Sequence, residues 1–232
     1  MAKAKIQTKQ LDTSSYDDNA RVIQNAKTFW EKYSKPIVYI FGGLTAILLG
    51  YIAYTNFYAA PREQKAADAI WQAQEYYNMD SLNLALKGDG QFPGFEKVIR
   101  DYSGTKAGNL AKFYAGSVSL RQGDFKKAEE YLKGFNTSSK TVQAVAWSRL
   151  GDALAEQGKS AEAITLYAKA GHHFPENQAL SSENLFKAGL LSEVQGKNDE
   201  AIKYYKEIKD KYSRTQRGFQ ISKYLARLGS ID

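Results

Sequence analysis

The chain has 232 residues, of which 43% are hydrophobic, and a formal net charge of +7. It contains no cysteine, which excludes a disulfide framework, a thiolate metal site, a cysteine nucleophile and a lipidated cysteine anchor. Acidic and basic residues interleave after Pro61 and form no basic stripe of the kind that nucleic-acid-binding proteins need. We therefore expect one domain of ordinary size and no nucleic-acid partner.

Residues 1–35 are predicted to form a tail with a short amphipathic helix. Val22, Ala26, Phe29 and Tyr33 fall on one helical face shortly before a long apolar stretch. A helix with such a face favours the membrane–water boundary. We therefore expect this helix to lie on a membrane surface.

The apolar stretch from Ile37 to Ala60 carries no charged residue. As a helix it would extend about 36 Å at 1.5 Å per residue, which exceeds the roughly 30 Å of a bilayer's hydrocarbon core. A buried core helix seldom runs so long without a charge. A cleaved signal peptide needs small residues where Phe57 and Tyr58 stand. We therefore predict a transmembrane signal anchor over 36–60.

The charges flanking this predicted anchor are uneven. Four cations precede it and only two follow closely: Arg21, Lys27, Lys32 and Lys35 on one side, Arg62 and Lys65 on the other. The positive-inside rule then places the tail in the cytoplasm and exports residues 61–232. Three small residues within the anchor are predicted to pack on other membrane helices, Gly42, Gly43 and Gly50.

A glycine, a second glycine seven residues later and an alanine five residues beyond recur three times. The sets are Gly116, Gly123 and Ala128, then Gly151, Gly158 and Ala163, then Gly189, Gly196 and Ala201. Recurrence at roughly 34 residues is typical of a helical solenoid, in which each unit needs its neighbours to bury its apolar face. We expect repeats at about 109–142, 144–177 and 182–215.

The middle unit comes close to the tetratricopeptide (TPR) pattern. Trp147, Leu150 and Gly151 give W-x2-L-G, while Ala163 and Tyr167 give A-x3-aromatic. Gly151 and Ala163 lack bulk where the two helices cross, and Gly158 supplies the turn. The sequence therefore predicts an all-α fold, with one N-terminal transmembrane helix followed by a solenoid of TPR-like hairpins.

Both ends of the solenoid are expected to be atypical. A first hairpin over 62–104 combines a long helix from Lys65 to Leu86 with a short helix from Phe95 to Tyr102. At the other end we predict a capping helix over 216–229, because a solenoid needs one to cover its last apolar face.

No group of residues predicts catalysis. The two histidines, His172 and His173, are adjacent, and neighbouring helical residues point in different directions, which suits a metal poorly. Carboxylate pairs such as Glu129 and Glu130 lie on charged helical surface. We expect no enzyme, no metal and no cofactor.

A partner-binding groove is expected on the first helices of the hairpins, which line the concave face of TPR solenoids. Counting from the repeat glycines, the residues predicted to project there are Phe113, Ser117, Leu120, Arg121, Ser148, Asp152, Glu156, Phe186, Leu190, Glu193 and Val194. This mixture of apolar and acidic side chains suits an extended or helical peptide with apolar anchors and some basic character. The open alternative is that some of these residues pack against neighbouring units.

The full layout resembles a known family. The tail SYDDNARVIQNAKTFWEKYSKP precedes one membrane helix, and the segment TKAGNLAKFYAGSVSLRQGDFKKAEEYL and the closing ISKYLARLG follow. Within these segments Ala111, Ala115, Asp124, Ala128 and Leu132 stand where the family has similar residues. The chain is thus similar to the YfgM-type ancillary subunits of the bacterial SecYEG translocon, although its Tyr76 to Phe95 region is longer.

This resemblance implies a single-pass protein of the bacterial inner membrane with a periplasmic TPR domain. Its implied partners are a SecYEG-type translocon, a PpiD-type membrane-anchored prolyl isomerase, exported polypeptides and the lipid bilayer. Two alternatives remain open. One is a scaffold of another cell-envelope assembly complex, and the other is a eukaryotic organelle import receptor, which the flanking charges disfavour.

Overall fold

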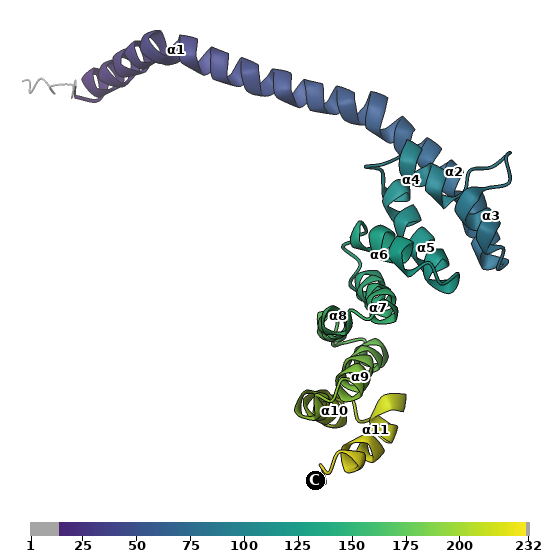
Figure 1. Ribbon diagram of the computed structural model, residues 1–232. Helices are drawn as coiled ribbons and strands as arrows, with labels where there is room; N and C mark the ends of the chain where they lie inside the picture. The colour runs from purple at the N-terminus through teal and green to yellow at the C-terminus, as the bar shows by residue number, and fades with distance from the viewer. Residues whose placement is uncertain (1–13, 231–232) are drawn as a thin grey trace, which may run out of the picture. The chain divides into compact units, whose positions relative to one another are not determined.

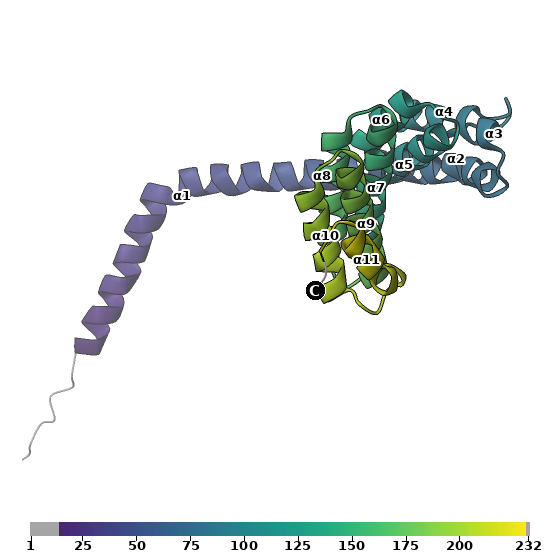
Figure 2. The ribbon, with the colours of Figure 1, turned by 60° about the horizontal axis from the view of Figure 1, so that its bottom comes forward.

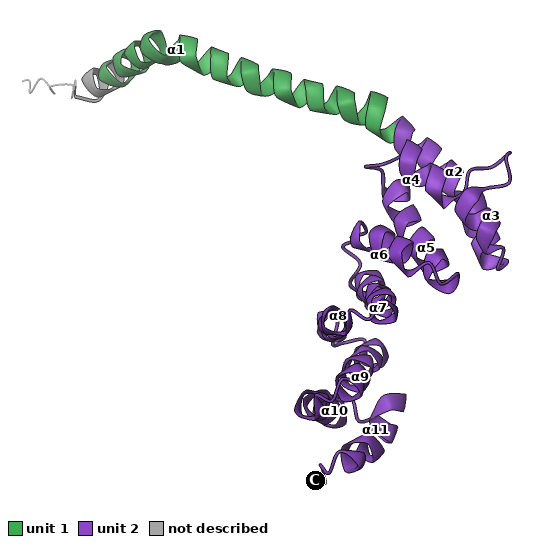
Figure 3. Cartoon of the chain, viewed as in Figure 1, with its two compact units in different colours: residues 1–60 green, residues 61–232 purple. Residues whose placement is uncertain are grey.

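The computed structural model describes residues 14–230 (Figure 1), so that residues 1–13 of the predicted tail lie outside the described part. The chain divides into two compact units, Met1–Ala60 and Pro61–Asp232 (Figure 3). Within residues 14–230 the regular structure is helical, apart from one isolated bridge between Gly88 and Pro93. The prediction of an all-α fold is confirmed.

The first unit consists of helix α1 (Ser14–Tyr54) and the π-helical turn η1 (Thr55–Ala59). The predicted amphipathic helix and membrane span form a single helix that contains Pro36 and bends within its length (Figure 2). Proline causes such bends because its ring clashes with the preceding turn and its nitrogen has no hydrogen to donate. The helical run Arg21–Asn78 is long and apolar enough to cross a membrane, by its length and composition.

The second unit opens with three helices, α2 (Ala60–Asn78), α3 (Leu82–Lys87) and α4 (Phe95–Asp101). The prediction of one helix from Lys65 to Leu86 is therefore wrong, because the chain turns between α2 and α3. Asp80 at this turn has a positive φ of 60°, a left-handed conformation that aspartate tolerates better than most residues.

Three helical hairpins and a final helix complete the second unit, stacked in sequence order (Figures 1 and 2). The hairpins are α5 (Lys106–Arg121) with α6 (Phe125–Lys133), α7 (Lys140–Glu156) with α8 (Ser160–His173), and α9 (Gln178–Val194) with α10 (Asn198–Lys211), and the final helix is α11 (Gln216–Arg227).

Each hairpin begins three or four residues before the start expected from the glycine spacing. The reason is local capping. The side chains of Thr105, Ser139 and Asn177 accept backbone hydrogen bonds at the starts of α5, α7 and α9, and Thr215 does the same for α11. Such caps satisfy amide groups that a helix start leaves unpaired.

The repeat residues produce turns and close approaches at the same place in each hairpin. In the middle hairpin Gly158 has a φ of 77° and forms the turn, which a residue with a side chain rarely adopts. A Cβ atom on Gly151 would lie 2.7 Å from the ring of Tyr167. Ala163 is fully buried, so the two helices approach closely, as the sequence predicts.

The apolar core forms three successive clusters along the solenoid. Phe95 and Val98 lie in the first, Leu154 and Tyr167 in the second, and Tyr205 in the third together with residues of α11. Helix α11 thus covers the apolar side of the last hairpin.

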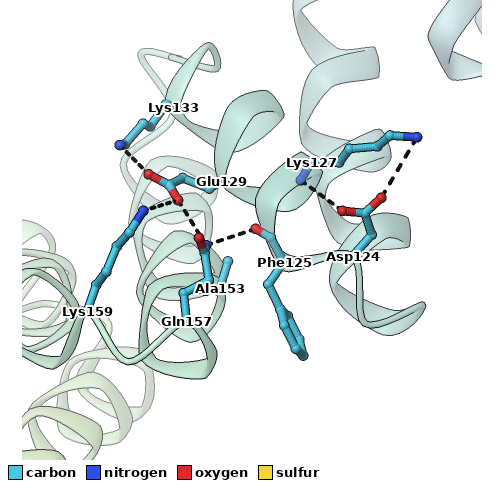
Figure 4. Close-up of polar contacts among 8 residues, drawn as sticks. All are labelled: Asp124, Phe125, Lys127, Glu129, Lys133, Ala153, Gln157 and Lys159. Atoms are coloured by element: carbon cyan, nitrogen blue, oxygen red, sulfur yellow. Dashed lines mark hydrogen bonds and ion pairs between the residues drawn. The ribbon is translucent and has the colours of Figure 1, made fainter.

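A partly buried carboxylate joins the first two hairpins (Figure 4). Glu129 on α6 accepts hydrogen bonds from Lys133 on its own helix and from Lys159 and Gln157 at the next hairpin turn, with Lys159 at 2.7 Å and Gln157 at 2.9 Å. These donors, Lys133 first, lower the pKa of Glu129 from 4.5 to about 2. The charged form of Glu129 therefore stabilises the contact between hairpins.

We predict that Gly151→Ala destabilises the solenoid by about 1–2 kcal/mol, because overpacking against Tyr167 outweighs the gain of about 1 kcal/mol in helix propensity. Urea unfolding followed by circular dichroism measures the change. The variant Ala161→Gly, at an exposed position of α8, measures the effect of helix propensity alone. If Gly151→Ala stabilised the protein, the close approach of Gly151 to Tyr167 would be contradicted.

We predict that Glu129→Gln lowers the free energy of unfolding at pH 7 by about 1 kcal/mol, since it removes charge-assisted hydrogen bonds. Because the pKa is lowered in the folded state, this contribution is fully present above pH 4.5 and is lost as the pH falls towards about 2. Urea unfolding at several pH values measures it. The exposed neighbour Glu130→Gln is the matched control, and equal effects of the two variants would refute the prediction.

Candidate partner-binding site

The predicted groove residues lie on α5, α7 and α9, the first helices of the three hairpins. Many of these residues contact the first helix of the following hairpin. In each case that following helix contributes a cation to the contact. We call the resulting series of contacts the cation ladder, formed by Arg121, Arg149, Lys187 and Arg217.

Between the first two hairpins the ladder cation is Arg149 on α7. Its guanidinium group lies 4.6 Å from the ring centroid of Phe113 on α5 and donates a hydrogen bond to the hydroxyl of Ser117. Ser117 is only 2% exposed. Both predicted groove residues are therefore occupied by a contact within the solenoid.

Between the second and third hairpins the ladder cation is Lys187 on α9. Its ammonium group bonds to Asp152 at 2.8 Å and to Ser148 at 3.2 Å on α7, and it lies 5.4 Å from the ring of Tyr167. The hydroxyl of Tyr167 donates a hydrogen bond to Asp152 at 2.8 Å. Burial, followed by the Asp152 charge, raises the pKa of Tyr167 far above its ordinary value, so the phenol remains a neutral donor.

The same arrangement closes both ends of the solenoid. At the N-terminal end Arg121 pairs with Asp80 and lies over the ring of Tyr77. At the C-terminal end Arg217 on α11 bonds to both carboxylate oxygens of Glu183, at 2.7 and 2.9 Å. Its guanidinium group also lies 3.9 Å from the ring centroid of Phe186.

Other predicted groove residues are also engaged. Glu193 accepts hydrogen bonds from Arg227 and Tyr205, and Leu120 packs against the second core cluster. Of the predicted set, the clearly exposed side chains other than Arg121 are Glu156, Leu190 and Val194.

A shallow pocket of about 230 Å³ opens where these exposed residues lie. Its lining is mostly apolar and comes from α7, α8 and α9: Asp152, Ala155, Tyr167, Lys187, Leu190, Leu191 and Val194. Leu190 is 38% and Val194 70% exposed. Leu190 directly follows the repeat glycine, where the other hairpins have Ser117 and Asp152, each bound by a ladder cation. The apolar Leu190 offers no such acceptor and stays open.

Some of the charged side chains near this pocket are paired within the chain and one is not. Asp152 and Lys187 neutralise each other at its wall, whereas Glu156 has no hydrogen bond or ion pair among the described residues. The pocket itself is mostly apolar, and the carboxylate of Glu156 stands outside its lining, one helical turn along α7 from the lining residue Asp152. Such a surface suits a peptide with an apolar side chain and a nearby basic residue.

Of the four ladder cations, Arg121 was among the residues predicted from the sequence, whereas Arg149, Lys187 and Arg217 were missed. Arg149 and Lys187 each stand two residues before the repeat glycine, so a recurring cation at this place is the signal that identifies them. The histidines also have structural partners, because His172 bonds to Glu207 of the next hairpin at 3.0 Å and His173 packs edge-on against Trp147.

The glycines of the predicted membrane helix have open surroundings. A Cβ atom added to Gly42, Gly43 or Gly50 would meet no neighbouring atom within 4 Å. Their role in packing against another membrane helix stays a prediction.

We predict that Arg217→Ala lowers the free energy of local opening of α11 by about 1–2 kcal/mol. The variant loses both the contact with the Glu183 carboxylate and the contact with the Phe186 ring. Amide hydrogen exchange of α11 measures this opening. Arg217→Lys is expected to restore only part of the protection, because a lysine lacks the planar fork that binds both oxygens. The exposed Lys203→Ala variant is the control, and unchanged exchange in Arg217→Ala would refute the role of the contact.

Comparison with known proteins agrees with this architecture. A family model described as a tetratricopeptide repeat-like domain matches residues 27–226, more than half of the chain. No curated protein sequence matches the chain. The chain belongs to the tetratricopeptide repeat-like domain family, whose folds typically serve as protein-interaction modules.

Proposed function

We propose that this chain is a membrane-anchored protein-interaction module that acts as an ancillary subunit of a bacterial Sec translocon. In this role it would lie in the inner membrane and assist exported polypeptides on the periplasmic side, beside a PpiD-type prolyl isomerase. The tail-anchor-solenoid layout and the cations before the anchor support this proposal.

The observation that carries the proposal is the open pocket around Leu190 and Val194. Most of the predicted groove is occupied by the cation ladder or by packing, whereas this apolar surface is left uncovered by the described residues. Exposed apolar surface of this kind marks interaction sites in soluble domains. An unfolded exported chain offers apolar side chains in abundance.

Attachment to a membrane compensates for the small size of the pocket. Arg62 and Glu63 directly follow the predicted anchor, and Glu63 accepts hydrogen bonds from the first amides of α5 while Arg62 donates to Asp101 on α4. The contacts of the solenoid therefore begin within three residues of the end of the predicted anchor. Confinement near the exit of a translocon raises the effective concentration of its clients, so a weak site can capture them.

We predict that a photoreactive amino acid at Val194 forms adducts with exported polypeptides and with translocon subunits in living cells. The same probe at Thr165, an exposed position on the second helix of the middle hairpin, is the matched control. Adding Leu190→Asp is expected to reduce adduct formation at Val194 about tenfold, because a charge at an apolar contact costs about 1–3 kcal/mol.

Three results would contradict the proposal: no adduct at Val194, equal adducts at Val194 and Thr165, or adducts that consist only of subunits of another envelope complex. The last result would favour the scaffold alternative. Cleavage of the solenoid by protease added from the cytoplasmic side would overturn the orientation itself.

A further inference from the structure

The segment before the predicted anchor has a second, separate apolar surface. On the helix α1 the side chains of one face are apolar and largely aromatic: Val22, Ile23, Ala26, Phe29, Trp30 and Tyr33. The opposite face carries Arg21, Asn25, Thr28, Lys32 and Lys35. A helix with this division lies in the plane of a membrane interface when lipid is present.

No described part of the chain covers this apolar face. Val22 is 66%, Phe29 56% and Trp30 59% exposed. The rings of Phe29 and Tyr33 pack on each other along the helix, with ring centroids 4.9 Å apart, and Lys32 of the same helix lies over the Tyr33 ring. So much exposed aromatic surface on one helix marks a site for a partner beyond the described residues.

The position of Pro36 points to the membrane interface as that partner. Proline separates the amphipathic segment from the fully apolar one, and α1 bends within its length (Figure 2). If α1 were straight, residues 21–35 would project out of the membrane into water. A bend allows this segment to lie in the membrane interface instead. Trp30 precedes Ile37 by seven residues, about 10 Å along a helix, so its ring stays within reach of the lipid headgroups.

The charge of the segment points to the kind of lipid. Residues 21–35 contain four cations, Arg21, Lys27, Lys32 and Lys35, and one anion, Glu31, which gives 4 − 1 = +3. Cations beside an interfacial helix attract anionic headgroups, and long lysine side chains reach the headgroups while their stems stay in apolar surroundings. Tryptophan and tyrosine favour the same layer.

We propose that residues 21–35 form a lipid-binding surface that lies along the membrane interface, with the face of Val22, Ala26 and Phe29 inserted among the lipids and with a preference for anionic headgroups. This inference rests on the proposed membrane anchor. An interfacial helix at the N-terminal end of the span would fix two properties of the anchor. These are its rotation about its own axis and its depth in the bilayer.

The absence of cysteine allows a direct test with single spin labels in the full-length protein. Labels are attached to Ala26→Cys on the apolar face, to Thr28→Cys on the opposite face, and to Leu48→Cys within the span. The protein is placed in vesicles of phosphatidylethanolamine with phosphatidylglycerol, and collision of each label with dissolved oxygen and with a water-soluble nickel chelate is measured.

We expect the oxygen-to-chelate collision ratio to be about tenfold higher at Ala26 than at Thr28, because oxygen concentrates in lipid and the chelate stays in water. In vesicles of phosphatidylcholine alone the ratio at Ala26 should fall while that at Leu48 stays unchanged. An equal ratio at Ala26 in both vesicles would overturn the preference for anionic lipid.

Two further results separate the possible failures. Equal ratios at Ala26 and Thr28, with Leu48 shielded from the chelate, would overturn the lipid-binding surface while leaving the anchor intact. A Leu48 label exposed to the chelate would overturn the anchor and this inference with it. Because the vesicles contain no translocon and no exported chain, neither result depends on the proposed partners.

Discussion

The solenoid depends on one interaction repeated at each junction between first helices. A cation from one helix lies against an aromatic ring and bonds to an oxygen atom of the preceding unit, as Arg149 does with Phe113 and Ser117. Arginine or lysine placed in this way combines a cation–π contact with a charge-assisted hydrogen bond. Since each hairpin buries its apolar side only against its neighbours, these contacts hold the stack in register and close both of its ends.

This interaction also determines where the protein can bind a partner. The polar side chains of the first helices are largely bonded within the chain, so they have little capacity left for the carboxylate of a peptide tail. The exception lies at Leu190, where an apolar residue replaces the expected acceptor and exposes a pocket beside Val194. Binding is therefore expected to be local, apolar and weak, and the proposed membrane attachment would supply the concentration that such binding needs.

Much of the solenoid follows from residues whose roles are local. Gly158 and Gly151 are recognisable because a left-handed turn and a close helix approach each require glycine. The ladder was not predicted, because Arg149 and Ser117 are 32 residues apart and a partner in the next hairpin leaves no local pattern. The turn at Asp80 was missed because helical periodicity continues across it. Groove positions were counted from the repeat, which identifies the face of a helix but not whether a neighbour already occupies it.

The most direct test of the proposed role is to identify what the protein binds in the cell. Native membranes are dissolved in a mild detergent, the full-length chain is recovered through a C-terminal tag, and the accompanying proteins are identified by mass spectrometry. We expect translocon subunits to be recovered together with a periplasmic folding factor. Recovery of a different envelope complex without translocon subunits would contradict the proposed role.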